Sequence, residues 1–131
     1  MPSVTVYVSS YEQYSSAMPI GRAIATRVTE HVNYLVAKGI SFGGSFVGFS
    51  MHEHDTGTLS SGGWTLTYNL RSKRVANNFY AALNQMLEGE VEAIRITKTG
   101  VTGCMSFQSY KVEIKVDGIT CFGHILVRNA I

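Results

Sequence analysis

Charged residues are scarce in this chain of 131 residues, at 15% of the total, against roughly 25% in typical globular proteins. Serine, threonine, glycine, asparagine and tyrosine fill the deficit, a composition common in secreted proteins and in chains whose surface is covered in an assembly. The net charge of +2 is too small to indicate a nucleic-acid-binding protein. Apolar residues make up 45% of the chain, which excludes a disordered polypeptide.

Cysteines and long apolar runs are scarce as well. No segment approaches the run of about 18 apolar residues that spans a membrane as a helix. Because Cys104 and Cys121 are the only cysteines, at most one internal disulfide can form. The first residues lack the charged and apolar regions of a signal peptide, so we expect either a cytosolic protein or a mature secreted form, and the composition favours the secreted form.

A repeated order of secondary-structure elements is the strongest signal in the sequence. Apolar residues alternate in the predicted strands and recur every three or four positions in the predicted helices. The predicted elements are strand Val4–Val8, helix Ile20–Lys38 and strand Phe46–Met51, followed by strand Trp64–Leu70, helix Ser72–Glu88 and strand Glu92–Thr97. Two such units joined by a hairpin predict an α+β fold, a two-layer α/β sandwich with a ferredoxin-like β-α-β-β-α-β antiparallel sheet and both helices on one face. No linker interrupts the chain, so we expect a single domain over residues 1–131.

The last third of the chain predicts a C-terminal β-hairpin. Apolar and charged residues alternate up to Val116, and Asp117-Gly118 follows, which is a strong signal for a two-residue hairpin turn. This turn pairs Val116 with Ile119. We expect the hairpin to follow the four strands of the repeated unit.

The register of this hairpin fixes the surroundings of Cys121 and His124. Cys121 lies opposite Ile114 on the apolar face, and His124 lies beside Lys111 on the outer face. The same register places Cys104 away from Cys121. A disulfide needs Cα atoms within about 7 Å, so the register favours two separate buried thiols, with a bridge as the alternative.

His52 and His54 form a candidate metal site. Residues two apart on a strand share a face, so both imidazoles can reach one metal ion. A catalytic zinc ion normally has three protein ligands, and the spacing of Asp55, His31 and His124 does not identify the third. The alternative is a solvated strand end, and we predict no cofactor.

Basic residues at the start of the second predicted helix form a candidate anion site. Free backbone N–H groups at a helix N-terminus attract anions, and the Gly-rich stretch before the preceding strand could close over a bound ligand. The predicted ligand-binding residues are Arg71, Ser72, Lys73, Arg74, Gly62 and Gly63. The alternative is an ordinary solvated surface, because the chain has no glycine-rich phosphate-binding motif.

The sequence indicates an interaction protein in preference to an enzyme. No nucleophile is placed beside a base, and the carboxylates are scattered singly. The outer sheet face carries Thr5, Tyr7, Thr65 and Thr67 in place of charged residues. An antiparallel sheet face of this kind commonly packs on a partner, so we predict a homo-oligomer.

The first half of the chain carries a family resemblance. Its motifs are Glu30-His31-Val32 in a helix that ends at Gly39, the pair Gly43-Gly44, and the stretch from Gly63 to Asn69, which reads GWTLTYN. In order and spacing, residues 4–70 resemble the second half of the virally encoded killer toxins of smut fungi and their fungal and plant relatives. The resemblance implies a small secreted α/β sandwich that binds a target on a competing cell without catalysis. Those toxins are rich in disulfides, whereas this chain has two cysteines.

Two functions follow from these patterns. The first is a non-enzymatic binding protein, of the secreted killer-toxin or effector kind, that binds a target on another cell. The alternative is an oligomeric ferredoxin-like module that binds an anionic small molecule such as a nucleotide near Arg71 and Arg74.

Overall fold

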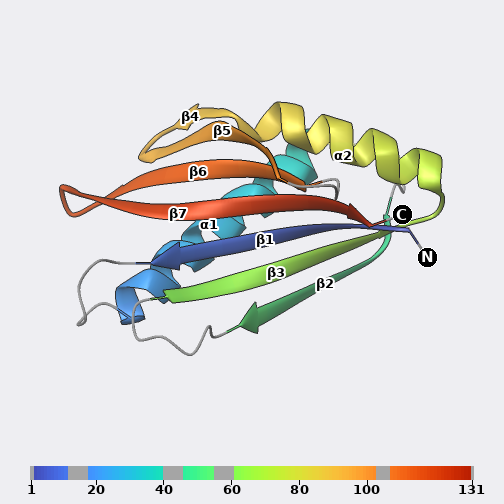
Figure 1. The fold of residues 1–131 in the computed structure, drawn as a ribbon. Helices are drawn as coiled ribbons and strands as arrows, with labels where there is room; N and C mark the ends of the chain where they lie inside the picture. Colours follow the sequence, from blue (N-terminus) through green and yellow to red (C-terminus); the bar gives the residue numbers. More distant parts are fainter. Residues whose placement is uncertain (1, 12–17, 40–45, 55–60, 103–106, 131) are drawn as a thin grey trace.

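One antiparallel sheet and two helices form the part of the chain that the computed structural model describes, residues 2–11, 18–39, 46–54, 61–102 and 107–130 (Figure 1). In chain order the elements are β1 (Ser3–Tyr11), α1 (Met18–Gly39), β2 (Phe46–His54), β3 (Ser61–Leu70), α2 (Lys73–Leu87), β4 (Gly89–Val91), β5 (Ile94–Thr102), β6 (Phe107–Val116) and β7 (Ile119–Ala130). The sheet has seven strands in the order β2-β3-β1-β7-β6-β5-β4. The predicted α+β sandwich class is therefore confirmed.

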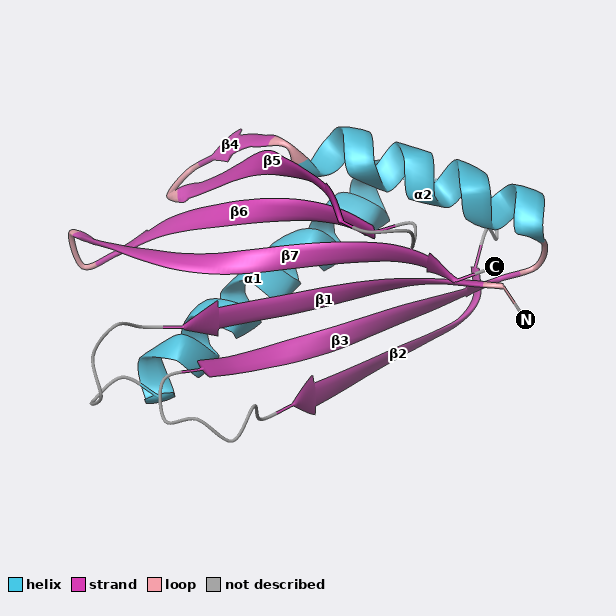
Figure 2. Ribbon diagram, viewed as in Figure 1, coloured by secondary structure: helices cyan, strands magenta, loops and turns pink. Residues whose placement is uncertain are grey.

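The strand order differs from the predicted ferredoxin-like topology. The first three strands form the expected neighbours β2-β3-β1, but the strand that follows α2 does not return to β1. Instead, β4, β5, β6 and β7 run back and forth as consecutive antiparallel neighbours, and β7 pairs with β1 (Figure 2). Short connections between sequential strands favour such a meander. The predicted C-terminal hairpin is thus not appended to a four-stranded sheet, because its second strand occupies the place beside β1.

The pairing of β6 with β7 follows the register that the turn residues predict. Val116 lies opposite Ile119, with Asp117-Gly118 between them. Both turn residues have positive φ angles, 52° for Asp117 and 80° for Gly118, as a type I′ turn requires. Cys121 is buried, as the register predicts. Cys104 lies outside the described residues.

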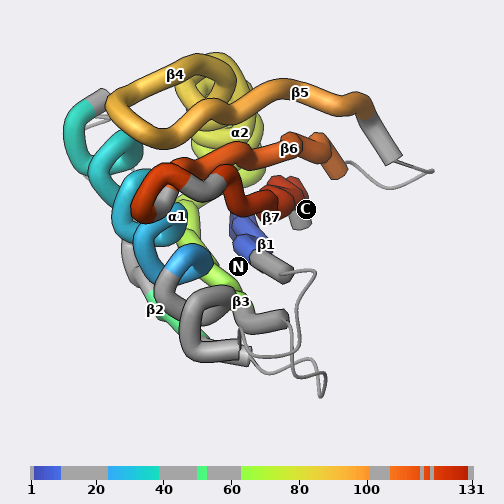
Figure 3. Tube along the Cα trace, turned by 90° about the vertical axis from the view of Figure 1, so that its left-hand side faces the viewer, coloured from blue at the N-terminus to red at the C-terminus, as the bar shows by residue number. Residues whose placement is uncertain are grey.

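Both helices cover the same face of the sheet. Figures 1 and 3 show α1 and α2 on one side of the strands, and Tyr68 on β3 contacts both of them. Its hydroxyl donates a hydrogen bond to Asn33 Oδ1 on α1 at 2.7 Å, and its ring lies 5.1 Å from the ring of Phe79 on α2. The buried residues form one hydrophobic cluster between the sheet and the helices. The opposite face of the sheet carries no helix in the described part of the chain.

The second helix begins where its sequence predicts. Ser72 is the N-cap, and its side-chain oxygen accepts a hydrogen bond from the Val75 N–H at 3.2 Å, which satisfies one of the free donors of the first turn. The buried residues of α2 recur at spacings of three and four and are Ala76, Phe79, Leu83 and Leu87. This stripe packs α2 onto the sheet.

Polar contacts fix each helix above a specific strand. On α1, Thr26 Oγ1 accepts a hydrogen bond from Trp64 Nε1 at 2.9 Å. On α2, the Tyr110 hydroxyl donates to Asn84 Oδ1 at 2.6 Å. Buried polar groups need such partners because desolvating them without a hydrogen bond costs about 1–3 kcal/mol. The helix layer is thus held in register with the sheet, and its position leaves the other sheet face open.

Candidate functional site

The face of the seven-stranded sheet opposite the helices carries no helix in the described part of the chain. Residues that lie directly opposite each other on paired strands project to the same face. His52 on β2 lies opposite Thr65 on β3, Thr65 lies opposite Tyr7 on β1, and Tyr7 lies opposite Leu126 on β7. One row of the face therefore runs across four strands without an aspartate, glutamate, lysine or arginine.

The centre of this face holds one cation, Arg128, and no acidic residue, and part of it is shielded from water. Thr5 points away from the helices, yet only 8% of its surface is exposed. Its neighbours in the next row are Thr67 on one side and Arg128 on the other. The Arg128 guanidinium lies 5.6 Å from the centre of the Phe107 ring, a cation–π contact that packs both side chains onto the sheet. Burial of a threonine on a helix-free face means that side chains of the sheet itself already exclude water there.

The other half of the face is charged. Lys111 Nζ lies 3.2 Å from Glu113 Oε1 and 5.2 Å from the centre of the Phe122 ring. Phe122 is 37% exposed. A charged rim beside a centre with few charges is typical of protein interaction surfaces.

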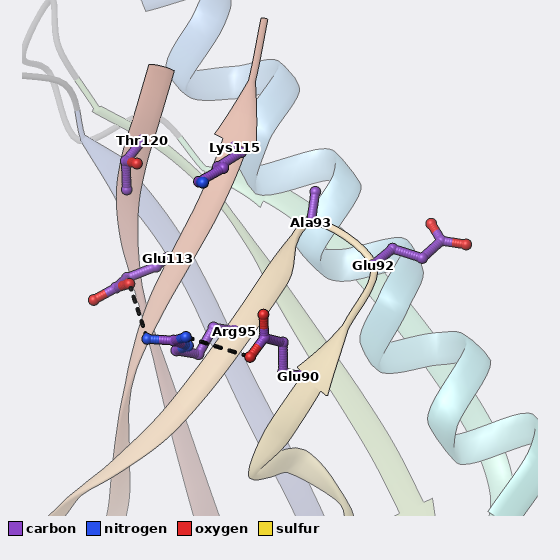
Figure 4. A pocket seen from close by; sticks show the side chains of 7 residues that line it. All are labelled: Glu90, Glu92, Ala93, Arg95, Glu113, Lys115 and Thr120. Atoms are coloured by element: carbon purple, nitrogen blue, oxygen red, sulfur yellow. Dashed lines mark hydrogen bonds and ion pairs between the residues drawn. The ribbon is translucent and has the colours of Figure 1, made fainter. Parts of the chain in front are cut away.

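A shallow hollow lies within this charged half (Figure 4). Its lining residues are Glu90, Glu92, Ala93, Arg95, Glu113, Lys115 and Thr120. Arg95 lies between two carboxylates, with nitrogen–oxygen distances of 3.4 Å to Glu90 and 4.0 Å to Glu113. Exposed ion pairs of this kind contribute about 0–1 kcal/mol. The hollow therefore resembles a solvated ion-pair network more than a catalytic cleft.

The predicted metal pair lies on the edge strand β2. His52 is exposed, and the sheet register places His54 opposite Gly63. Among the described residues, no three His, Cys, Asp or Glu side chains are grouped so as to hold a metal ion. His124 lies on β7, three strand spacings away, or about 14 Å, which is too far to share a zinc ion with His52.

The remaining histidine belongs to the helix layer. His31 lies on α1 and is half-buried. Desolvation by burial lowers the pKa of its imidazole, and the nearby carboxylate of Glu92 partly opposes this shift. His31 therefore supplies no third ligand to the β2 pair across the sheet. Asp55 lies outside the described residues.

The predicted anion-site residues divide between the two ends of β3. Arg71, Lys73 and Arg74 are exposed around the N-terminus of α2. Gly62 and Gly63 lie at the start of β3, and the seven residues Trp64–Leu70 of that strand separate Gly63 from Arg71, so the two lie about 27 Å apart. A small anion at the helix cannot contact the glycines. The structure does not bring the Gly62-Gly63 stretch to the predicted site, because both glycines are strand residues: Gly62 pairs with β1, and Gly63 pairs with β1 and β2.

The sequence patterns identified only part of the helix-free face. They placed Thr5, Tyr7, Thr65 and Thr67 outward, and His124 beside Lys111, but did not identify four further residues of β6 and β7, namely Phe107, Phe122, Leu126 and Arg128. In β7 the signal was present, because the outward positions of Phe122, Leu126 and Arg128 alternate with buried ones. It was missed because the position of β7 beside β1 depends on the sheet order.

Comparisons with protein-family models, with curated proteins and with solved structures give no match. No helix in the described residues is long and apolar enough to cross a membrane. The function is therefore inferred from the residues of the helix-free face.

Proposed function

We propose that this chain is a non-enzymatic binding protein that contacts a macromolecular partner through the helix-free face of its sheet. The observation that carries this proposal is the centre of that face, around Thr5, which is partly buried and holds one cation, Arg128, and no acidic residue. A solvated antiparallel sheet face normally alternates polar residues outward. Here Tyr7, Phe107 and Leu126 lie among the outward serines and threonines, with ion pairs at one side. Tyrosine and phenylalanine in such a setting are typical of interface centres.

The partner class is a component of another cell's surface, in keeping with a secreted toxin or effector. The resemblance of residues 4–70 to the killer toxins supports this part of the proposal. An α/β sandwich with an open sheet face is compatible with it. The low content of charged residues, 15%, also supports a secreted protein that associates with itself.

Binding to intact fungal cells tests this function. Fluorescently labelled protein should bind saturably, and unlabelled protein should compete. The double variant Thr67→Glu and Leu126→Glu adds two carboxylates to a centre that holds no acidic residue and should weaken binding at least about tenfold, because a carboxylate is costly to bury against a partner. The matched control, Thr97→Glu with Thr120→Glu, adds the same charges at exposed positions of the charged half and should bind within about twofold of the parent protein.

Circular dichroism and the thermal midpoint establish that both variants fold. Equal binding by the face variant and the parent protein would contradict the use of this face. Absence of saturable binding by the parent protein would reject the toxin-like function.

An anion-binding module is the second candidate. It is favoured by one observation, that Arg71, Lys73 and Arg74 surround the start of α2, whose first turn contains no acidic residue. Each charge-assisted hydrogen bond to a phosphate contributes about 1.5–3 kcal/mol before screening by salt.

Titration with tripolyphosphate tests this candidate. Arg71→Ala with Arg74→Ala should weaken binding at least about tenfold and leave the thermal midpoint nearly unchanged, because neither side chain belongs to the buried stripe of α2. The control, Arg95→Ala, removes a cation remote from the helix. Identical affinity in the double variant and the parent protein would show that Arg71 and Arg74 do not bind the anion and belong to an ordinary solvated surface.

A further inference from the structure

The sheet has two edges of very different character. At one edge, β4 is only three residues long, and Glu90 within it pairs with Arg95 on the neighbouring strand. At the other edge, β2 has nine residues and pairs only with β3 among the described strands (Figure 2). A free edge presents unpaired backbone N–H and C=O groups to any strand that approaches it.

The β2 edge carries few of the devices that usually protect a free strand. Short length, charged side chains (lysine above all), proline and bulges all discourage edge pairing. The sequence of β2, FVGFSMHEH, contains no lysine, arginine or proline, and Glu53 is its one acidic residue. Its irregularity lies at the start, between Phe46 and Gly48, and from Gly48 to His54 the strand pairs with β3 in continuous register. This leaves a regular outer edge seven residues long.

Three side chains in the middle of this edge are accessible to solvent. Ser50, Met51 and His52 are all exposed, and 46% of the Met51 surface is accessible to solvent. Met51 lies on the helix side of the sheet, where its sulfur is 4.0 Å from Asn33 Nδ2. An exposed methionine at an unprotected edge is apolar surface that a neighbouring strand can cover.

We propose that β2 pairs with β2 of a second copy of this chain, in antiparallel orientation about a two-fold axis. In this arrangement the outer edge of β2 is used on both copies, and each copy satisfies the free backbone groups of the other. A two-fold interface requires such use of the same surface on both subunits. Pairing of β2 with β4 would instead build an open filament, and β4 offers only three residues to such a contact. The edge therefore fits a closed dimer.

The dimer would join two of the proposed binding faces. This part of the inference rests on the proposed function. Opposite residues of an antiparallel pair project to the same face, so both helix layers lie on one side of the joined sheet. The two helix-free faces then form one continuous surface on the other side. A surface with two identical contact sites binds a repetitive target, such as a cell wall or an array of receptors, more tightly than either site alone.

Sedimentation equilibrium of the full chain from roughly 1 to 100 µM tests the pairing. The parent protein should form dimers and no larger species. Ser50→Lys with His52→Lys should weaken dimerisation at least about tenfold, because lysines on a free edge oppose strand addition. The matched control, Thr97→Lys with Thr120→Lys, adds the same charge to the same face away from the edge and should dimerise as the parent protein does.

Hydrogen exchange provides the second measurement. Amides between Gly48 and His54 should gain protection as concentration rises, whereas those of β4 should not. A monomer at every concentration, or equal dimerisation by the edge variant, would overturn the proposal. So would loss of the dimer in Thr67→Glu with Leu126→Glu alone, which would indicate packing of two helix-free faces. A monomer that still binds cells through its face would leave the proposed function intact, so the two failures are distinguishable.

Discussion

Replacing Phe79 by alanine should lower the free energy of unfolding by about 3–5 kcal/mol. Phe79 is fully buried on α2, and its ring packs against Tyr68 of β3 with 5.1 Å between centroids. Removing it leaves a cavity where the second helix meets the sheet. Because a domain of this size is stable by only about 5–15 kcal/mol, this variant loses a large part of its stability.

Urea unfolding measures this effect, with the midpoint and the slope fitted separately. The matched control is Asn78→Ala, the exposed neighbour on the same helix, which should change stability by less than about 0.5 kcal/mol. A loss below about 1 kcal/mol for Phe79→Ala would contradict the packing of α2 on the sheet.

Alkaline solution should unfold the protein steeply above about pH 10. Burial raises the pKa of the phenols of Tyr68 and Tyr110 well above their usual value of 10. In the folded protein both phenols keep their protons, whereas in the unfolded chain they ionise near pH 10. The stabilisation is therefore fully present below pH 10 and is lost as pH rises through the folded-state pKa values. Each tyrosine contributes about 1.4 kcal/mol per pH unit, so the two together give about 2.7 kcal/mol per unit.

Unfolding free energies measured between pH 9 and 12 check this dependence. Tyr68→Phe should cost about 1–2 kcal/mol at pH 7, because Asn33 loses its hydrogen-bond donor, and should reduce the alkaline slope by about 1.4 kcal/mol per unit. Tyr34→Phe is the control, since 55% of Tyr34 is exposed, and its slope should match that of the parent protein. An unchanged slope in Tyr68→Phe would show that the buried phenol is not the group that titrates.

Local patterns in the sequence predicted most of the elements but not the order of the sheet. Alternation of valines predicted β1, and Ser72 predicted the start of α2, because each signal acts within a few residues. Asp117-Gly118 predicted the register of β6 with β7 for the same reason. Strand order depends on contacts between residues far apart in sequence. The strand after α2 could equally return to β1 or begin a meander, and no local residue distinguishes these paths.

In the candidate site, too, local patterns predicted some residues, and contacts between distant strands determined the others. Thr5 and Tyr7 were placed on the outer face by alternation alone, whereas Arg128 joined them only through the pairing of β7 with β1. The grouping of Gly63 with Arg71 failed because a stretch expected to be a loop extends β3 instead. Glycine-rich sequence predicts turns, but here pairing with strands on both sides holds it extended.

Photo-crosslinking from the helix-free face tests the central claim most directly. A benzophenone analogue of phenylalanine replaces Tyr7, at the centre of the face, or Tyr34, which is exposed on α1. The labelled proteins are bound to intact fungal cells and irradiated. If the helix-free face is the binding surface, the analogue at position 7 forms covalent adducts with a cell-surface component, and the analogue at position 34 does not. Adducts from position 34 alone, or from neither position, would contradict the claim.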